Sequence, residues 1–289
     1  MAVSTPTAPT LARRPRAVRP ELYFVGSAIF HYLGPAFAVL LFARVPILGV
    51  AWLRIVSAAI VLGVWRRPWR HFAEFDRTLI GLGVVLAVMN VCFYESIGRL
   101  PLGTVAAIEF VGPIVLAAVG ARSRRNLAAL LLAAGGVYAL TDVRLAGQAL
   151  GFAFAFANAG LFTLYIMLGH RVSRKVSLGG IDGLAASMLV AAVAVTPIAG
   201  WAAGPALLDP VALAAGIGVG VASSVVPYVC DQLAMAQLPR STYALMVALL
   251  PATATIIGVV VLTQLPTAVE LVGVALVIGG VALHRGRPE

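Results

Sequence analysis

Charged residues are scarce in this sequence. Only 11% of the 289 residues are Asp, Glu, Lys or Arg, while 61% are hydrophobic, and soluble domains carry about 25% charged residues. A soluble fold of this length needs a largely polar surface, which this composition does not supply. We therefore interpret the chain as an integral membrane protein surrounded by a lipid bilayer.

Cysteines and enzyme motifs are also few. The two cysteines, Cys92 and Cys230, lie inside apolar segments, which favours a packing role over a disulfide framework. The patterns of a Walker loop, an HExxH zinc site, a CxxC pair and a nucleophile elbow do not occur in a usable context. We therefore expect no enzyme activity, no cofactor and no metal site.

Long hydrophobic runs, by contrast, fill the chain. Apolar segments of about 17–24 residues can cross a hydrocarbon core of ~30 Å as helices. They run over 22–42, 47–65, 78–97, 102–120 and 126–141 in the first half, and over 147–168, 180–200, 211–235, 240–262 and 267–283 in the second. These segments predict an all-α membrane protein of about ten transmembrane helices. A disordered cytoplasmic arm (1–21) precedes them, and a cytoplasmic tail (284–289) follows.

The basic residues predict the orientation. With the N-terminus in the cytoplasm, 17 of the 21 Lys and Arg residues fall in cytoplasmic segments. Arg44, Arg99 and Arg144 fall on the opposite side, and Arg54 lies within a span. Cytoplasmic loops carry such an excess of Lys and Arg, so both termini are expected in the cytoplasm and the chain in the cytoplasmic (inner) membrane. The net charge of +10 follows from these loops, so no nucleic-acid partner is expected.

The sequence also repeats itself. The stretch from Met89 to Pro113 has a partial copy from Pro227 to Pro251, at a constant offset of 138 residues. The identical pairs are Cys92 and Cys230, Leu100 and Leu238, Pro101 and Pro239, Thr104 and Thr242, Ala106 and Ala244, and Pro113 and Pro251. Because five helices are an odd number, the two halves, 22–141 and 147–283, would enter the membrane from opposite sides. Inverted repeats of this kind are typical of secondary transporters.

Glu109 is the most informative polar residue of the spans. It lies about 11 Å along its helix, where a carboxylate costs roughly 2.5–3.5 kcal/mol on insertion scales. It must therefore be protonated, meet a cation or face a water-filled cavity. Pro113 cannot donate a hydrogen bond to the carbonyl of Glu109, which leaves that oxygen available to water or to a substrate ammonium. The alternative is a protonated, structural Glu109 bonded to a neighbouring helix.

Other polar side chains in the spans are further candidates. Asp231 is either a second ionisable group of the pathway or a solvated helix end, and Glu95 is expected at the outer end of its span. For Arg54, a structural ion pair is favoured over a role as a substrate clamp. The remaining candidates, which supply hydrogen-bonding or titratable groups at membrane depth, are Asn90, Tyr94, Asn158, Tyr165, Tyr228 and His31. Together with Phe93, Phe110 and Phe162 they would suit a partly apolar pocket for a small zwitterion whose ammonium meets Glu109.

Two stretches resemble a known family. MNVCFYESIGRLPLGTVAAIEFVGPIVLA, from Met89, and VVPYVCDQLAMAQLPRSTYALMVALLPATA, from Val225, are similar to the threonine/homoserine exporter branch of the drug/metabolite transporter superfamily, EamA type. The matching residues are Met89, Asn90, Phe93, Tyr94, Ser96, Ile97, Pro101, Leu102, Gly103, Glu109, Phe110, Gly112, Pro113, Pro227, Tyr228 and Asp231. Glu95, His31 and the stretch VVVLTQLPT depart from the pattern of the branch. The resemblance implies ten spans in two inverted halves and the export of small amino acids.

Together these features predict a secondary active transporter. It would export small, threonine/homoserine-like amino acids or related metabolites in exchange for protons, through alternating access, as a monomer or homodimer. The alternative is a transporter of another solute, such as an amphiphilic compound, in which Glu109 is structural. The candidate substrate- or proton-binding residues are Glu109, Asn90, Tyr94, Asp231, Tyr228, Tyr165, Asn158 and His31.

Overall fold

The structure, a computed structural model, describes residues 20–112, 115, 123–142, 145–173, 180–235 and 250–283. Within these ranges the chain forms helices and no β-strand, which confirms the all-α prediction. The first half contains α1 (Pro20–Leu41), α2 (Ile47–Arg66), η1 (Pro68–Glu74), α3 (Arg77–Ile97), α4 (Leu102–Glu109) and α6 (Arg124–Asp142). The second half contains α7 (Leu145–Ser173), α8 (Gly180–Ala199), η2 (Gly200–Ala203), α9 (Gly204–Leu208), α10 (Pro210–Gly220), the π-helix η3 (Val221–Val225), α11 (Val226–Met235), α13 (Leu250–Leu262) and α14 (Ala268–Leu283).

Six helical stretches in the described part of the chain are long and apolar enough to cross a membrane. They are Leu22–Leu41, Ile47–Arg66, Arg77–Ile97, Gln148–Gly169, Gly180–Leu208 and Pro210–Asp231, and α13 and α14 are shorter apolar helices. The count of ten spans stays a prediction, because segments 102–120 and 240–262 lie partly outside the described residues. The described residues also leave out the tail 284–289, most of the arm 1–21, Pro113 and Val247. Val247 is the residue that would match Glu109 in the second repeat.

Several helices begin at residues that satisfy their first backbone N–H groups. The carboxylate of Asp76 accepts a hydrogen bond from Leu79 N (2.9 Å) at the start of α3. Asp209 accepts from Val211 N (2.9 Å) and Ala212 N (3.2 Å) at the start of α10. These caps fix where the long apolar runs become helical, because the first turn of a helix has no internal acceptors for its donors.

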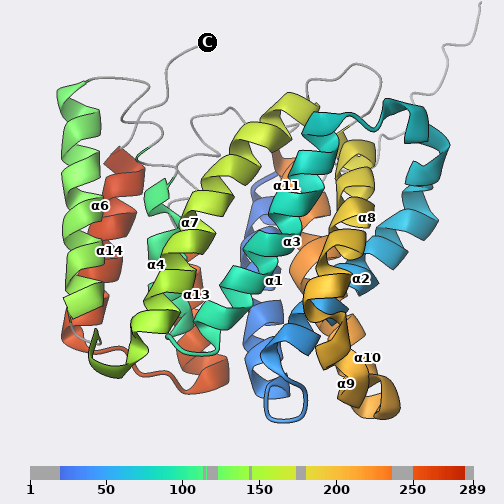
Figure 1. Cartoon of the computed structure of the whole chain (residues 1–289). Coiled ribbons are helices and arrows are strands. Elements are labelled where there is room, and N and C mark those ends of the chain that lie inside the picture. Colours follow the sequence, from blue (N-terminus) through green and yellow to red (C-terminus); the bar gives the residue numbers. More distant parts are fainter. Residues whose placement is uncertain are drawn as a thin grey trace, which may run out of the picture.

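The helices pack as a bundle in which distant segments are neighbours. The pair α6 and α14 forms one edge, and α2 and α8 lie toward the opposite edge (Figure 1). Between them α3 packs on α7 and α8, α1 packs on α11 and α13, and α4 packs on α13 and α7. The chain reversals at 98–101 and 263–267 lie at the same end, because the side-chain Oε1 of Gln264 accepts a hydrogen bond from Leu102 N (3.1 Å).

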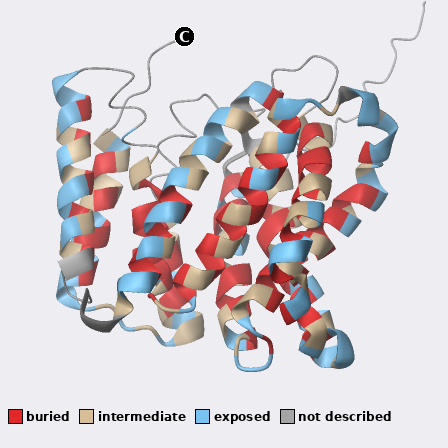
Figure 2. Cartoon of the chain, viewed as in Figure 1, coloured by how far each residue is buried: buried red, intermediate tan, exposed pale blue. Residues whose placement is uncertain are grey.

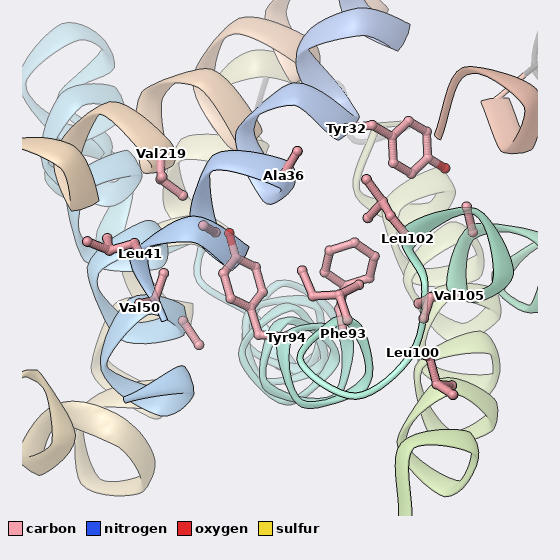
Figure 3. Packing of buried hydrophobic residues seen from close by; sticks show 14 of the residues in the cluster. Tyr32, Ala36, Leu41, Val50, Phe93, Tyr94, Leu100, Leu102, Val105 and Val219 are labelled. Carbon is pink, nitrogen blue, oxygen red and sulfur yellow. The ribbon is translucent and has the colours of Figure 1, made fainter. Parts of the chain in front are cut away.

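Buried residues line the inner faces of the helices, and exposed ones lie on the outside (Figure 2). The larger core cluster joins α1, α2, α3 and α4, and it contains Tyr32 and Ala36 of α1 together with Phe93 and Tyr94 of α3 (Figure 3). The outer faces are also apolar, as at Val64, whose side chain is 68% exposed. In a bilayer such faces meet lipid, so this exposure agrees with a membrane-spanning protein.

Glycines bring α10 close to α2. A Cβ added at Gly216 would lie 2.5 Å from the side chain of Leu53, and one at Gly220 would overlap Ser57 Oγ and lie 2.8 Å from the carbonyl oxygen of Arg54. Gly216 and Gly220 are four residues apart, the small-xxx-small spacing that allows two helices to approach closely. This contact holds the middle of α2 against the start of the π-helix η3.

Candidate functional site

Glu109 is the last residue of α4, and Phe110 follows it in a turn. The helix is therefore interrupted directly after the carboxylate. Glu109 is buried, and its Oε1 accepts a hydrogen bond from Asn158 Nδ2 at 3.1 Å. Within the described residues no Lys or Arg nitrogen lies within 4.0 Å of this carboxylate. Among the residues that the structure describes, Glu109 is thus a buried acid without an ion-pair partner.

Asn158 lies on α7 together with two of the aromatic residues. Asn158, Phe162 and Tyr165 follow one another at spacings of four and three, which places them on one face of the helix. The rings of Phe162 and Tyr165 stack at 5.9 Å, and Phe110 meets Phe162 edge-on at 5.9 Å. The acid is therefore followed by a short aromatic row that runs from α4 along α7.

Asn90 and Tyr94 lie one turn apart on α3. Asn90 Nδ2 donates to the carbonyl oxygen of Ala51 at 2.9 Å, so its amide joins α3 to α2. Tyr94 is fully buried, and its ring centre lies 5.4 Å from the guanidinium carbon of Arg54. The Asn90 amide nitrogen therefore links two helices, its Oδ1 is buried without a hydrogen-bond partner among the described residues, and Tyr94 borders a buried cation.

Arg54 lies in the middle of α2, and its side chain reaches the π-helix η3. Nε donates to Ser224 Oγ at 3.0 Å, and Nη2 donates to the carbonyl oxygen of Ser223 at 3.2 Å. Proline at position 227 has no N–H, so it cannot donate to the carbonyl of Ser223 in the manner of an α-helix. Arg54 supplies the donor that the proline lacks. No carboxylate of the described residues lies within 4.0 Å of the guanidinium, so the expected structural ion pair is absent among them.

Three further candidates, His31, Tyr228 and Asp231, lie on α1 and α11. His31 is half-buried on α1, and its ring meets that of Tyr32 edge-on at 5.3 Å. Tyr228, on α11, lies within electrostatic range of Arg54, Glu109, Asp231 and Tyr94. Asp231 is half-buried one turn before the end of α11. Ionisable groups from α2, α4 and α11 thus act on one another electrostatically.

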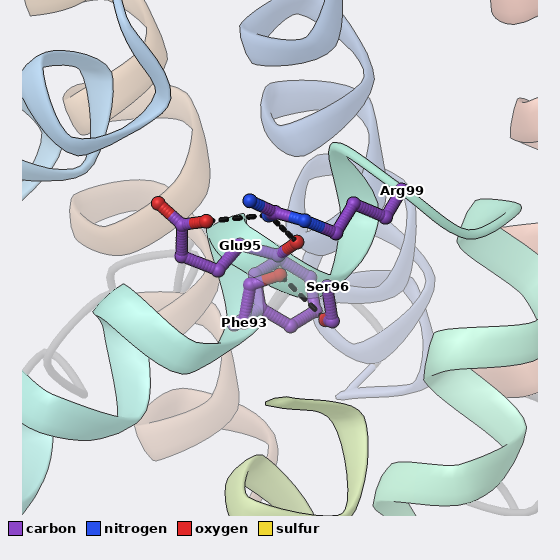
Figure 4. A network of polar contacts seen from close by, with 4 residues as sticks. All are labelled: Phe93, Glu95, Ser96 and Arg99. Carbon is purple, nitrogen blue, oxygen red and sulfur yellow. Dashed lines mark hydrogen bonds and ion pairs between the residues drawn. The ribbon is translucent and has the colours of Figure 1, made fainter. Parts of the chain in front are cut away.

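Glu95 and Arg99 lie at one end of the bundle, where α3 ends. Arg99 Nη1 donates to both the carboxylate and the carbonyl oxygen of Glu95 (Figure 4). A cavity of about 340 Å³ lies at this end, with Arg99, Gln264 and Glu270 among its lining residues. Glu95 is thus engaged near the helix end, away from the interior acid.

Of the eight candidate residues, the structure brings Glu109 and Asn158 into direct contact and places Tyr94 beside Arg54. Sequence reasoning missed the Arg54 contacts with Ser223 and Ser224. A signal was available, because two serines precede a proline within an apolar run. A proline in a span frees a carbonyl that a donor from another helix must satisfy.

Comparisons with known proteins agree with this architecture. Residues 149–285 match the EamA-like transporter family. The chain is 30% identical over 253 residues to the threonine/homoserine exporter RhtA of Escherichia coli (strain K12) and to that of Salmonella typhimurium (strain SL1344), covering 85% of this chain and 84% of each relative. A solved crystal structure aligns over 91% of this chain and 95% of its own, with a TM-score of 0.57 and 17% identity. That structure supports the fold alone.

The fold and these relatives define the class: the protein is a multi-pass transporter of the cytoplasmic membrane. Within this class the chain belongs to the EamA-like transporter family, in agreement with the resemblance in its sequence.

Proposed function

We propose that this protein exports small amino acids, such as threonine and homoserine, or related metabolites from the cytoplasm in exchange for protons. The similarity to exporters of threonine and homoserine supports this substrate class. Glu109 alternates between a protonated form and a carboxylate that binds the substrate ammonium. Protons and substrate thereby compete for one group, which couples their movements in opposite directions.

The observation that carries this proposal is the solitary burial of Glu109. A carboxylate left unpaired in a low-dielectric interior is strongly disfavoured, so it takes up either a proton or a cation. Its hydrogen bond from Asn158 is compatible with both states, because an amide N–H can donate to a carboxylate or to the carbonyl oxygen of a protonated carboxyl. An ion pair with a fixed Arg or Lys would have removed this alternation.

We further propose that 22–141 and 147–283 are two inverted repeats that rock about the site. The packing supports this division. The first helix of each half packs on two helices of the other half: α1 packs on α11 and α13, and α7 packs on α3 and α4. Three pairs, α2 with α8, α4 with α13 and α6 with α14, join equivalent helices of the two halves. The family match at 149–285 spans the second proposed repeat. A pseudo-two-fold arrangement of this kind supports alternating access.

The orientation belongs to the same proposal. The turns at 42–46, 98–101 and 263–267 lie at one end of the bundle, and the segment 67–76 and the end of α14 lie at the other (Figure 1). With ten spans and cytoplasmic termini, the first end is the outer one. The low count of basic residues in the turns at this end supports that assignment.

A second candidate is favoured by the aromatic row beside Glu109. Phe110, Phe162 and Tyr165 offer flat apolar surface next to an acid, which also suits an amphiphilic cation. In that case Glu109 would serve as a fixed counter-ion or as a structural hydrogen-bonding group.

Counterflow in proteoliposomes separates these candidates. Vesicles containing the purified protein are loaded with unlabelled threonine, homoserine, another amino acid or an amphiphilic amine, and the entry of the labelled form of the loaded compound is followed at two external pH values. Exchange with threonine and homoserine that responds to pH is expected. Exchange with the amine and with none of the amino acids would favour the second candidate.

A further inference from the structure

Arg54 has hydrogen-bonding capacity that the described residues do not use. A guanidinium carries five N–H donors. One on Nε reaches Ser224 Oγ, and one on Nη2 reaches the carbonyl oxygen of Ser223. Apart from the Tyr94 side chain, which also interacts with the guanidinium, no described residue accepts a hydrogen bond from the two donors of Nη1 or from the second donor of Nη2. One donor of Nη1 and the second donor of Nη2 lie side by side at the outer edge of the guanidinium, and this pair forms the fork that matches the two oxygens of a carboxylate.

No carboxylate of the described residues lies within 4.0 Å of Arg54 to compensate its positive charge. The side chain is 8% exposed, and its near neighbours include the rings of Phe93 and Tyr94, 5.9 and 5.4 Å from the guanidinium carbon. Cation–π contacts of this kind stabilise the charge by about 0.5–2 kcal/mol, whereas removing an ion from water costs several kcal/mol. A buried arginine in this setting needs an anion.

Close packing holds the guanidinium in place. Gly220 lets the π-helix approach the backbone of α2 at Arg54, and Gly34 lets it approach α1, since a Cβ there would lie 2.9 Å from Ser223 N. With Nε and Nη2 fixed by two serines, the free edge has a defined direction. Short π-helical segments within α-helices occur frequently at functional sites.

Buried polar atoms elsewhere in this interior also lack partners. Among the described residues Tyr32 OH and Asn158 Oδ1 are inaccessible and make no hydrogen bond. Buried polar groups are normally satisfied by protein or by bound molecules. Tyr32 lies on α1, and Glu109 acts on it electrostatically. Among the described residues, hydrogen-bond partners are therefore missing near Glu109 as well as at the guanidinium of Arg54.

We propose that Arg54 binds the carboxylate of the transported substrate through its free edge, as a counterpart of Glu109. Arg54 and Glu109 lie within electrostatic range of each other but form no ion pair. A zwitterion with one carboxylate and one ammonium neutralises both groups at once. Arg54 then selects α-amino acids over amines, amides and esters. This inference rests on the proposed function, because it names the second half of the same site.

Binding to the purified full-length protein in detergent tests the proposal. Labelled L-threonine is the probe, and L-homoserine, L-threoninamide and 1-amino-2-propanol are competitors that keep or lose the carboxylate. The wild type is expected to bind threoninamide about 10- to 100-fold more weakly than threonine, the range for hydrogen bonds to a charged group. Arg54→Gln is expected to weaken threonine binding by a similar factor and to bring acid and amide to nearly equal affinity. Arg54→Lys keeps the charge without the fork and should retain part of the preference.

The control variant is Arg44→Gln, which removes an exposed arginine that pairs with Asp209 at a helix end and should leave the preference intact. Equal competition by threonine and threoninamide in the wild type would overturn the assignment without any variant. A parallel loss of acid and amide binding in Arg54→Gln would also overturn it and leave Arg54 as a structural donor to η3. If the wild type binds none of the amino acids, the proposed function fails first, and the two failures are thereby distinguished.

Discussion

Gly220 offers a test of the packing that positions Arg54. A Cβ at this residue would overlap Ser57 Oγ and lie 2.8 Å from the carbonyl oxygen of Arg54. Overpacking of this kind costs about 1–3 kcal/mol, and the better helix propensity of alanine returns at most about 1 kcal/mol. Gly220→Ala is therefore expected to lose about 1–2 kcal/mol. For a protein of this size that corresponds to roughly 2–8 °C in the midpoint of thermal unfolding.

Gly218→Ala is the matched control, because it lies in the same helix and a Cβ there meets no atom within 4 Å. Its midpoint is expected to stay the same or to rise. Both variants are compared with the wild type by tryptophan fluorescence on heating, in one detergent and at one heating rate, since unfolding of this kind is often irreversible. A midpoint for Gly220→Ala equal to or above that of Gly218→Ala would refute the close approach of α10 to α2.

Two further predictions concern polar contacts at the helix ends. Arg66 binds Asp182 through Nε and Nη2 at 2.6 and 3.0 Å. Because the pair is partly exposed, a double-mutant cycle with Arg66→Gln and Asp182→Asn should give a coupling free energy of about 0.5–1 kcal/mol that decreases in high salt. A coupling free energy that does not change with salt would contradict this account. Glu270 Oε2 accepts a hydrogen bond from Thr267 N (2.8 Å), and Glu270 N donates one to Thr267 Oγ1 (3.2 Å). Glu270→Ala should therefore lower the free energy of unfolding, measured by thermal unfolding, by about 0.5–2 kcal/mol. Glu270→Gln should restore most of that loss, because glutamine can also form this reciprocal cap.

The helices were predictable because a bilayer imposes one length on every span. The apolar runs 47–65, 78–97 and 180–200 agree within two residues at each end with α2, α3 and α8, since any shorter run would leave polar backbone in lipid. Glu109 could be singled out for the same reason, as an ionisable residue at membrane depth.

The partners of the buried charges could not be predicted. Asn158 lies 49 residues from Glu109, and whether it faces α4 depends on the rotation of α7, which tertiary packing decides. The sequence shows that Pro227 frees the carbonyl of Ser223, but it does not show which donor arrives. Arg54, 169 residues from Ser223, was therefore expected to find an acid, whereas its contacts in the structure are two serines and two aromatic rings.

The central claim is that Glu109 couples substrate movement to protons, and Glu109→Gln tests it most directly. Proteoliposomes with and without a pH gradient are compared for uptake of labelled threonine by the wild type, by Glu109→Gln and by the control Glu95→Gln, which changes the other glutamate of this region. Glutamine keeps the size and a hydrogen-bond acceptor for Asn158 but cannot exchange a proton. The account predicts that the wild type and Glu95→Gln respond to the gradient and that Glu109→Gln does not. Undiminished gradient-driven uptake by Glu109→Gln would contradict it.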